Sequence, residues 1–375
     1  MALNRNVPFY LQVVSILRNE IISGKFLPGN PLPQEEELAA RFEVSKDVIR
    51  VSLRMLAEDG LIIRIRSKGT FVCENLNSNN RRILLTVCQN PVAVDLLRHG
   101  AERGAAKGKY DLVLKKVHPF DLAAEQRCMK TVKHSDFAAM VVTPAIAPDD
   151  SDNRELYSKY IRYGVPVIAI DHEFTDIPVD IVCFDEYGSM RAVAEECLQT
   201  VPGKTAFFLR KMPHRIARRR NQALKEVAWG LPSHSKCVFE VSAEGFDEDS
   251  IVDDFFCQLE KSGFIPDSIL VDNNIYGFKL FERMQGNEKF KSLKIIGTVG
   301  DTKFGNNDFN SRLLCHYRLY DDFIEPLEEI LSLRLENRMP VGMSMVRMIK
   351  FRPMTSEQIS SYFIRALQPD YTGFL

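Results

Sequence analysis

The chain has 375 residues, of which 45% are hydrophobic and 26% charged, and its formal net charge at pH 7 is −1. This length exceeds one ordinary domain and favours a small domain beside a larger two-lobed one, in a globular protein of usual composition. A charge so close to zero excludes a protein that attracts nucleic acid by bulk positive charge alone.

The cysteines and histidines predict neither a disulfide framework nor a metal site. The eight cysteines stand singly, without a CxxC pair, and the seven histidines form no HxH or HExxH spacing. This spread is typical of reduced, mostly buried thiols in a cytoplasm. The apolar runs are only strand-length and the first residues lack the pattern of a secretion signal. We therefore expect a cytoplasmic protein without a transmembrane helix, a bound metal or a cofactor.

The first 75 residues predict three short helices followed by a two-stranded hairpin. Apolar spacing and turn residues place the helices over residues 9–23, 35–42 and 46–58 and the strands over 61–65 and 70–73. Ser45 is a good N-cap for the third helix, and Gly60 ends it. This order is the outline of a winged helix-turn-helix, which places one helix in a DNA major groove.

The same segment resembles the amino-terminal signature of GntR-type bacterial transcription regulators. The matching pieces, in order, are Tyr10-x-Gln12, Ile21-Ile22-x-Gly24, Pro28-Gly29-x-x-Leu32-Pro33, Leu38-Ala39, Val44-Ser45, Arg50, Leu53, Leu56, Gly60-Leu61-Ile62 and Lys68-Gly69-Thr70-Phe71-Val72. Residues 1–75 contain ten Lys/Arg and nine Asp/Glu, so any attraction to DNA must come from the placement of the cations.

The resemblance implies that Lys46 and Arg50 lie near bases or phosphates, with Lys68 and Gly69 at the tip of the wing. On charge alone, a solvated charged face is the alternative, but the ordered motif favours DNA binding. The candidate DNA-binding residues are Gln34, Ser45, Lys46, Asp47, Arg50, Arg54, Lys68 and Gly69.

The segment departs from the family pattern in three respects. Gln34 replaces a common Ser, which predicts a poorer cap for the second helix. Glu36 replaces a common Arg, and Lys46-Asp47 replaces the usual Arg-Thr. A carboxylate repels phosphate unless it accepts a hydrogen bond from a cytosine amino group. The DNA preference of the family therefore does not transfer to this chain.

After a polar segment at 75–80, which we interpret as a linker, strands alternate with helices. The first series has strands over 83–88, 111–117, 138–143 and 165–171 and helices over 94–107, 122–133 and 156–163. The second has helices over 187–198, 216–228, 247–261 and 276–285 and strands over 205–209, 238–241, 268–272 and 294–298. Continuous apolar strands in this rhythm predict doubly wound parallel sheets in two lobes, with ligand at the carboxyl ends of the strands.

This part of the chain resembles the effector domain of LacI-type repressors and their periplasmic sugar-binding relatives. The matching pieces are Ala139-Met140-Val141-Val142, Gly164-Val165-Pro166-Val167-Ile168-x-Ile170-Asp171, Phe184-Asp185-x-x-Gly188-x-x-x-Ala192, Pro266-Asp267-Ser268-Ile269-Leu270-Val271-x-Asn273-Asn274, Ile295-Ile296-Gly297 and Arg352-x-x-Thr355. GntR-type heads joined to such a domain form an arabinose-repressor-like group.

The predicted fold class is α/β, with an α+β winged head before a two-lobed domain of the periplasmic-binding-protein type. The predicted boundaries are 1–74 for the head, 75–80 for the linker, 81–355 for the effector domain and 356–375 for a tail. Lobe 1 is expected at about 81–184 and 300–322, and lobe 2 at about 185–299 and 323–355. The tail reads as an added helix.

The resemblance also implies which residues meet an effector. They are Gln89, Asn90, Asp171, Arg218, Arg219, Phe246, Asn274 and Asp301. Gln89 and Asn90 follow the first strand of lobe 1, at the expected mouth of the cleft. Asp171 corresponds to a ligand-contacting carboxylate, and a loop cap is the alternative.

One of Arg218 and Arg219 corresponds to the ligand arginine of the family, with a register ambiguity of one residue. The surrounding arginines suit a phosphorylated effector or are solvated charges of a helix face. Phe246 stands where the family stacks a ring on its ligand, and core packing is the alternative. Asn274 stands where relatives carry an extra charge, which favours a more neutral effector, and Asp301 aligns loosely with the last ligand Asp.

We therefore expect a homodimeric repressor of a carbohydrate-utilisation operon, released from operator DNA when a sugar or sugar derivative binds. A non-sugar or phosphorylated effector, or activation instead of repression, is the alternative. A further alternative is a binding protein without DNA affinity, which is suggested by Glu36, Asp47 and the near-neutral head. No nucleophile elbow, P-loop or dinucleotide glycine pattern is present, so we expect no enzyme and no catalytic residues.

Overall fold

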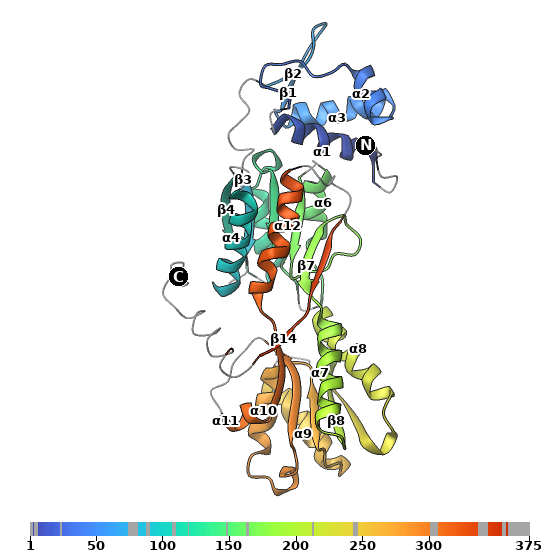
Figure 1. The fold of residues 1–375 in the computed structure, drawn as a ribbon, viewed down its shortest axis with the longest axis vertical. Helices are drawn as coiled ribbons and strands as arrows, with labels where there is room; N and C mark the ends of the chain where they lie inside the picture. The colour runs from blue at the N-terminus through green and yellow to red at the C-terminus, as the bar shows by residue number, and fades with distance from the viewer. Residues whose placement is uncertain are drawn as a thin grey trace. The chain divides into compact units, whose positions relative to one another are not determined.

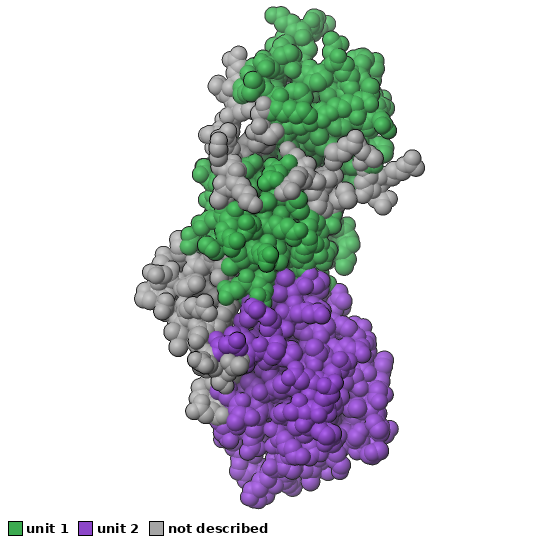
Figure 2. All heavy atoms as spheres, in the orientation of Figure 1, with its two compact units in different colours: residues 1–147, 151–183, 320–347 green, residues 148–150, 184–319, 348–375 purple. Residues whose placement is uncertain are grey.

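The computed structural model describes residues 3, 7–22, 25–73, 82–87, 91–106, 110–118, 120–147, 149–162, 165–211, 214–242, 247–300, 307–336, 344–354 and 358. Figure 1 shows the ribbon, and Figure 2 colours its two compact units. Unit 1 comprises residues 1–147, 151–183 and 320–347, and unit 2 comprises 148–150, 184–319 and 348–375. No helix in these described ranges is both long and apolar enough to cross a membrane.

The head of unit 1 has the three helices and the hairpin that the sequence predicts. They are α1 (Phe9–Ile22), α2 (Glu35–Phe42), α3 (Lys46–Glu58), β1 (Ile62–Ile65) and β2 (Gly69–Val72). The two strands pair antiparallel, with Ile62 opposite Val72. Leu17, Leu38 and Leu53 bring one side chain from each helix into a common core. Burying such leucines contributes roughly 2 kcal/mol each, so the apolar stripes hold the head together.

The rest of unit 1 is built on a six-stranded sheet in the order β13-β7-β6-β5-β3-β4. Its strands are β3 (Arg82–Val87), β4 (Asp111–Lys116), β5 (Ala139–Val142), β6 (Val167–Ile170), β7 (Asp180–Phe184) and β13 (Val346–Ile349). Strands β4, β3, β5, β6 and β7 are joined by parallel pairings. Its helices are α4 (Pro91–Ala106), α5 (Leu122–Lys130), α6 (Arg154–Arg162) and α12 (Ile324–Leu335). Strands β5, β6 and β7 are buried along their whole length, as central strands of parallel sheets are.

Unit 2 repeats this architecture with the strand order β14-β12-β11-β10-β8-β9. Its strands are β8 (Thr205–Lys211), β9 (Lys236–Ser242), β10 (Ser268–Val271), β11 (Ile295–Gly300), β12 (Leu313–Tyr317) and β14 (Arg352–Pro353). Its helices are α7 (Glu186–Thr200), α8 (Arg215–Trp229), α9 (Glu248–Ser262), α10 (Asn274–Met284) and α11 (Asn307–Ser311). The ring of Phe208 stacks on Phe255 at 4.5 Å between centroids, in the core between sheet and helices.

Helix α7 packs closely against strand β11 at Gly297, where a side chain would require its neighbours to shift. A Cβ atom there would lie 2.6 Å from Leu270 Cδ2 and 3.2 Å from the Cβ of Cys197 on α7. The doubly wound packing of helix on sheet therefore depends on a missing side chain in this strand.

Two segments of the chain belong to the opposite lobe from the one that the sequence predicted. Residues 300–319 belong to unit 2, because β12 pairs in parallel with β11. Residues 323–347 belong to unit 1, where α12 packs against α4. The sequence interpretation assigned both the other way, since it had no element to place there. The linker at 75–80, and all of the tail at 356–375 except residue 358, lie outside the described residues.

A buried ion pair joins the returning helix α12 to the sheet of unit 1. Both guanidinium contacts from Arg334 to the Asp180 carboxylate measure 2.6 Å, and each side chain is almost fully buried. The same carboxylate accepts the backbone N–H of Met345 at 2.9 Å. Removing one member of such a pair leaves the other charge buried, without a partner and without water.

We predict that Asp180→Asn lowers the free energy of unfolding by about 3–5 kcal/mol, because Arg334 loses its counter-charge. Denaturant unfolding followed by circular dichroism measures the change. Glu329→Gln is the matched control, since Glu329 on the same helix pairs with Arg347 on the surface. That change is expected to cost at most about 1 kcal/mol. Equal effects of both substitutions would contradict the structural role of the buried pair.

Candidate nucleic-acid interface and effector residues

The start of α3 is exposed because the opposite face of the helix is in the core. Ile49, Leu53 and Leu56 are buried. Lys46 and Arg50, on the other face, are exposed. The predicted recognition helix therefore presents its cations to solvent, as a helix that enters a major groove must.

Both helices of the helix-turn-helix begin with a polar cap. The Ser45 hydroxyl oxygen accepts the backbone N–H of Val48 at 3.4 Å, as predicted for an N-cap. At the start of α2, the backbone N–H of Gln34 donates to the Glu37 carboxylate at 2.9 Å. Glu37 thus satisfies a donor at this end of the helix and compensates for the poorer cap expected of Gln34.

The cations of this surface are held by carboxylates of α2. Glu35 accepts the Arg50 Nε at 2.9 Å and an Arg64 guanidinium nitrogen at 2.5 Å, which ties α2 to α3 and to the wing strand β1. Glu36, where the family pattern has an arginine, accepts the Lys46 ammonium at 2.6 Å. The structure therefore brings Glu35, Glu36, Lys46 and Arg50 together with Arg64, a residue that the sequence interpretation missed.

In each of these pairs, the pKa of one member shifts in the direction that favours its charged form. The hydrogen bond from Lys46 lowers the pKa of the Glu36 carboxyl, and the hydrogen bond to Glu35 raises the pKa of the Arg50 guanidinium. Asp47 adds a second contact to Arg50 at 3.2 Å. The side chains of Lys46 and Glu36 are about half exposed. Such pairs are weak in water, so a phosphate group can take the place of the carboxylate.

The wing is a short hairpin whose turn uses the left-handed backbone region twice. Ser67 has φ 62° and Gly69 has φ 115°, and the Lys68 backbone N–H donates to the Ile65 carbonyl at 3.0 Å. Lys68 and Gly69 are exposed there, and Arg54 is exposed on α3. All eight predicted DNA-binding residues are thus on the surface of the head, although Arg54 and Lys68 take no part in the ion pairs described above.

Among the effector candidates, Asp171 occupies a strained turn at the carboxyl end of β6. Its φ is 55°, its backbone N–H donates to Val182 at 2.8 Å, and its carboxylate accepts the Tyr320 hydroxyl at 3.3 Å. Left-handed backbone in a residue other than glycine costs about 1 kcal/mol or more and is frequent at functional sites. Asp171 is half-buried, with a carboxylate held in place by a neighbouring hydroxyl.

The four arginines of α8 are not equivalent. Arg218 is exposed and contacts the Asp150 carboxylate at 2.6 Å, while Arg215 contacts the same carboxylate at 2.9 Å. Arg219 is exposed. Arg220 is buried against Glu186 at 2.6 Å and the Asp272 carbonyl at 2.7 Å, so its role is structural. Asp150 was missed because its polar loop has no periodic pattern.

The last described candidate, Asn274, is fully buried at the start of α10. Its side chain fills the space beside Gly300, where a Cβ atom would lie within 2.3 Å of the amide. The candidates Gln89, Asn90, Phe246 and Asp301 lie outside the described residues. Asp171 belongs to unit 1, and Arg218, Arg219 and Asn274 belong to unit 2.

Comparison with known proteins identifies both parts of this architecture. Residues 9–72 match the model of the bacterial regulatory proteins of the gntR family. An arabinose metabolism transcriptional repressor of Geobacillus stearothermophilus is 23% identical over 187 residues, which are 48% of this chain and 51% of the repressor. The chain spans about half the length of this relative and about a quarter of other matching regulators.

Solved structures resemble the larger part. The Cra transcriptional dual regulator of Pseudomonas putida, in complex with fructose 1-phosphate, has a TM-score of 0.53 at 17% identity and covers 74% of this chain and 98% of its own. The periplasmic component of an ABC-type sugar transport system of Hahella chejuensis has a TM-score of 0.54 at 12% identity and covers 73% of this chain and 100% of its own. These likenesses establish the fold.

We predict that Glu36→Gln strengthens binding to random duplex DNA roughly threefold at 50 mM salt. The slope of the logarithm of the binding constant against the logarithm of the salt concentration should become more negative by about one. The reason is that Lys46 loses its carboxylate partner and becomes available to a phosphate. Fluorescence anisotropy with a labelled duplex measures both quantities. Glu195→Gln makes the same charge change on an exposed ion pair of α7 and is expected to leave both unchanged. Weaker binding by Glu36→Gln would refute the competition between Glu36 and DNA.

Proposed function

We propose that this chain, which joins a GntR-type winged helix-turn-helix to a domain of the LacI and periplasmic sugar-binding fold, is a sugar-responsive transcriptional repressor. The observation that carries the proposal is the exposed cationic start of α3 on a chain whose larger part has a ligand-binding fold. The proposal includes a homodimer in the cytoplasm that acts by binding and not by catalysis.

In this proposal α3 enters the major groove of the operator. Arg50 exchanges Glu35 for a phosphate or for the acceptor edge of a guanine, which an arginine contacts with two parallel hydrogen bonds. Lys68 at the wing tip contacts the adjacent backbone. Asp47 and Glu36 accept hydrogen bonds only from a donor such as a cytosine amino group, which supports an operator unlike those of relatives with Arg-Thr.

The effector is proposed to be a sugar or sugar derivative. This rests on the relatives, one of which is named an arabinose repressor and another of which is solved with fructose 1-phosphate. Asp171 is proposed as a ligand for effector hydroxyls, because its carboxylate already accepts one hydroxyl, that of Tyr320. The boundaries proposed with this function are 1–74 for the head, 75–80 for the linker and 81–355 for the effector domain.

The experiment that tests the function combines two measurements on the full chain. A thermal-shift screen against neutral sugars and their phosphates detects the effector, because a ligand of the folded state raises the melting temperature. A gel shift with the DNA upstream of its own coding region, with and without the effector, detects repression. Effector binding without any DNA binding would favour the alternative of a ligand-binding protein without an operator.

We predict that Arg50→Ala weakens operator binding roughly tenfold or more, because it removes a contact of the recognition helix. Fluorescence anisotropy with the operator fragment measures the loss, and the melting temperature without DNA is expected to stay unchanged. Arg283→Ala, which removes an exposed arginine from α10, is the control and is expected to bind operator normally. Normal operator binding by Arg50→Ala would remove α3 from the proposed interface.

We predict that Asp171→Ala abolishes the thermal shift caused by the effector while operator binding is retained, because the carboxylate no longer accepts the sugar hydroxyls. Asp176→Ala is a suitable control in the same unit, since its exposed carboxylate pairs with Arg154 at 2.7 Å. A normal thermal shift in Asp171→Ala would exclude Asp171 from the effector site.

A further inference from the structure

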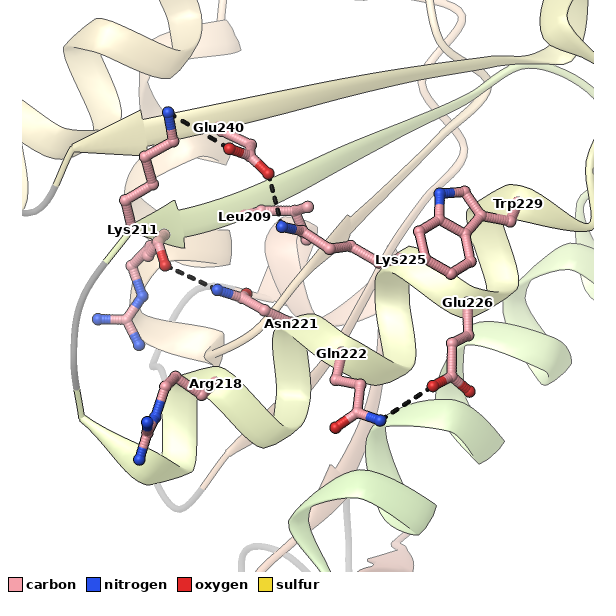
Figure 3. Close-up of a pocket in the computed structure, with 10 residues that line it drawn as sticks. Leu209, Lys211, Arg218, Asn221, Gln222, Lys225, Glu226, Trp229 and Glu240 are labelled. Atoms are coloured by element: carbon pink, nitrogen blue, oxygen red, sulfur yellow. Dashed lines mark hydrogen bonds and ion pairs between the residues drawn. The ribbon is translucent and has the colours of Figure 1, made fainter.

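A pocket lies within unit 2, between α8 and the strands β8 and β9 (Figure 3). Its volume is about 420 Å³, within the range of small-molecule sites. None of Asp171, Arg219 and Asn274 lines it, and Arg218 alone among the described effector candidates does. The pocket therefore begins at the carboxyl end of β8, continues along α8 to Trp229, and shares only Arg218 with the described effector candidates.

One face of α8 supplies most of the wall. Arg218, Gln222, Lys225 and Trp229 follow one another at intervals of three and four residues, which places them on the same side of the helix. In Figure 3, Trp229 stands at one end of the pocket, and Arg218 with Lys211 stands at the other. An apolar ring and a cationic end are thus separated along one groove.

The cationic end carries more positive than negative charge. The ammonium groups of Lys225 and Lys211 lie 2.6 Å and 3.3 Å from the same carboxylate, that of Glu240. Two ammonium groups that share one carboxylate retain one uncompensated positive charge and further N–H donors. Both lysines are substantially exposed, so an anion in the pocket can reach them.

The other end offers the groups that bind a sugar ring. Trp229 is the only tryptophan of the chain, and it is 76% exposed although the indole is strongly apolar. On the same helix, the Gln222 amide donates to the Glu226 carboxylate at 3.0 Å, an arrangement that supplies donors and acceptors to hydroxyl groups. An exposed indole beside such a pair is suited to the C–H face of a sugar.

We propose that this pocket is a second small-molecule site, specific for a sugar phosphate. Lys211 and Lys225 bind the phosphate, the Gln222–Glu226 pair binds ring hydroxyls, and the indole of Trp229 covers the apolar face of the sugar. A neutral sugar lacks the group that the lysines bind, and inorganic phosphate lacks the ring. The site belongs to unit 2 alone and does not depend on the proposed DNA binding.

The single tryptophan makes the proposal directly testable by intrinsic fluorescence of the full chain. Glucose 6-phosphate is titrated at 150 mM salt, with glucose and inorganic phosphate titrated separately. The expected result is a saturable change in Trp229 emission with glucose 6-phosphate and a Kd at least tenfold weaker for either fragment. Equal responses to inorganic phosphate or to glucose would overturn the assignment to a sugar phosphate.

The variant Lys211→Gln/Lys225→Gln is expected to weaken glucose 6-phosphate binding at least tenfold, because both charge-assisted contacts are lost. Lys261→Gln, on α9 and outside the pocket, is the control and is expected to bind normally. Calorimetric titration of Trp229→Phe provides a readout independent of fluorescence and should show weakened binding.

Two results would overturn the site. One is unchanged binding in the double lysine variant, and the other is the absence of both an emission change and heat in the unmodified protein. If Asp171→Ala removes the response and the lysine variant does not, the sugar phosphate binds at the proposed effector site. The second site is then refuted while the proposed function stands.

Discussion

Pairing of cations with carboxylates is the interaction on which both the stability and the surfaces of this protein depend. Where water is excluded, as between Arg334 and Asp180 or Arg220 and Glu186, the pair is structural, because neither charge tolerates burial alone. Where water is present, as between Lys46 and Glu36, the same pairing is weak and exchangeable. Solvent exposure therefore separates the ion pairs that hold the fold from those that can give way to a ligand.

In the head, the ion pairs lie on an exposed surface whose net charge is close to zero. Glu35 joins α2 to both α3 and β1 through Arg50 and Arg64, so the unbound head has an ordered arrangement of cations. In the proposed complex, DNA must compete with these carboxylates for the same side chains. Under the proposed function, this pairing would make the head discriminate against random phosphate and depend more on the contacts that an operator base sequence provides.

The parallel sheets determine where polar side chains gather. Both faces of each sheet are covered by helices, so polar side chains gather where strands end and helices begin. Asp171 follows β6, Asn274 follows β10, and Arg210 near the end of β8 is held by Asp272 at 2.6 Å. The pocket along α8 begins at the carboxyl end of β8 and continues along one flank of unit 2, where a helix face and the edge strand β9 meet.

The sequence by itself determined the elements of the head and the alternation of strands and helices, because periodicity, caps and turn residues act over a few neighbouring positions. It also indicated Ser45, Lys46 and Arg50 through an ordered motif. Only the tertiary structure decided the return of residues 320–347 to unit 1, the binding of Arg50 and Arg64 by Glu35, and the burial of Arg220 beside exposed Arg218 and Arg219. These outcomes join residues far apart in the chain, and charge pairing and burial between such residues leave no periodic trace in the sequence.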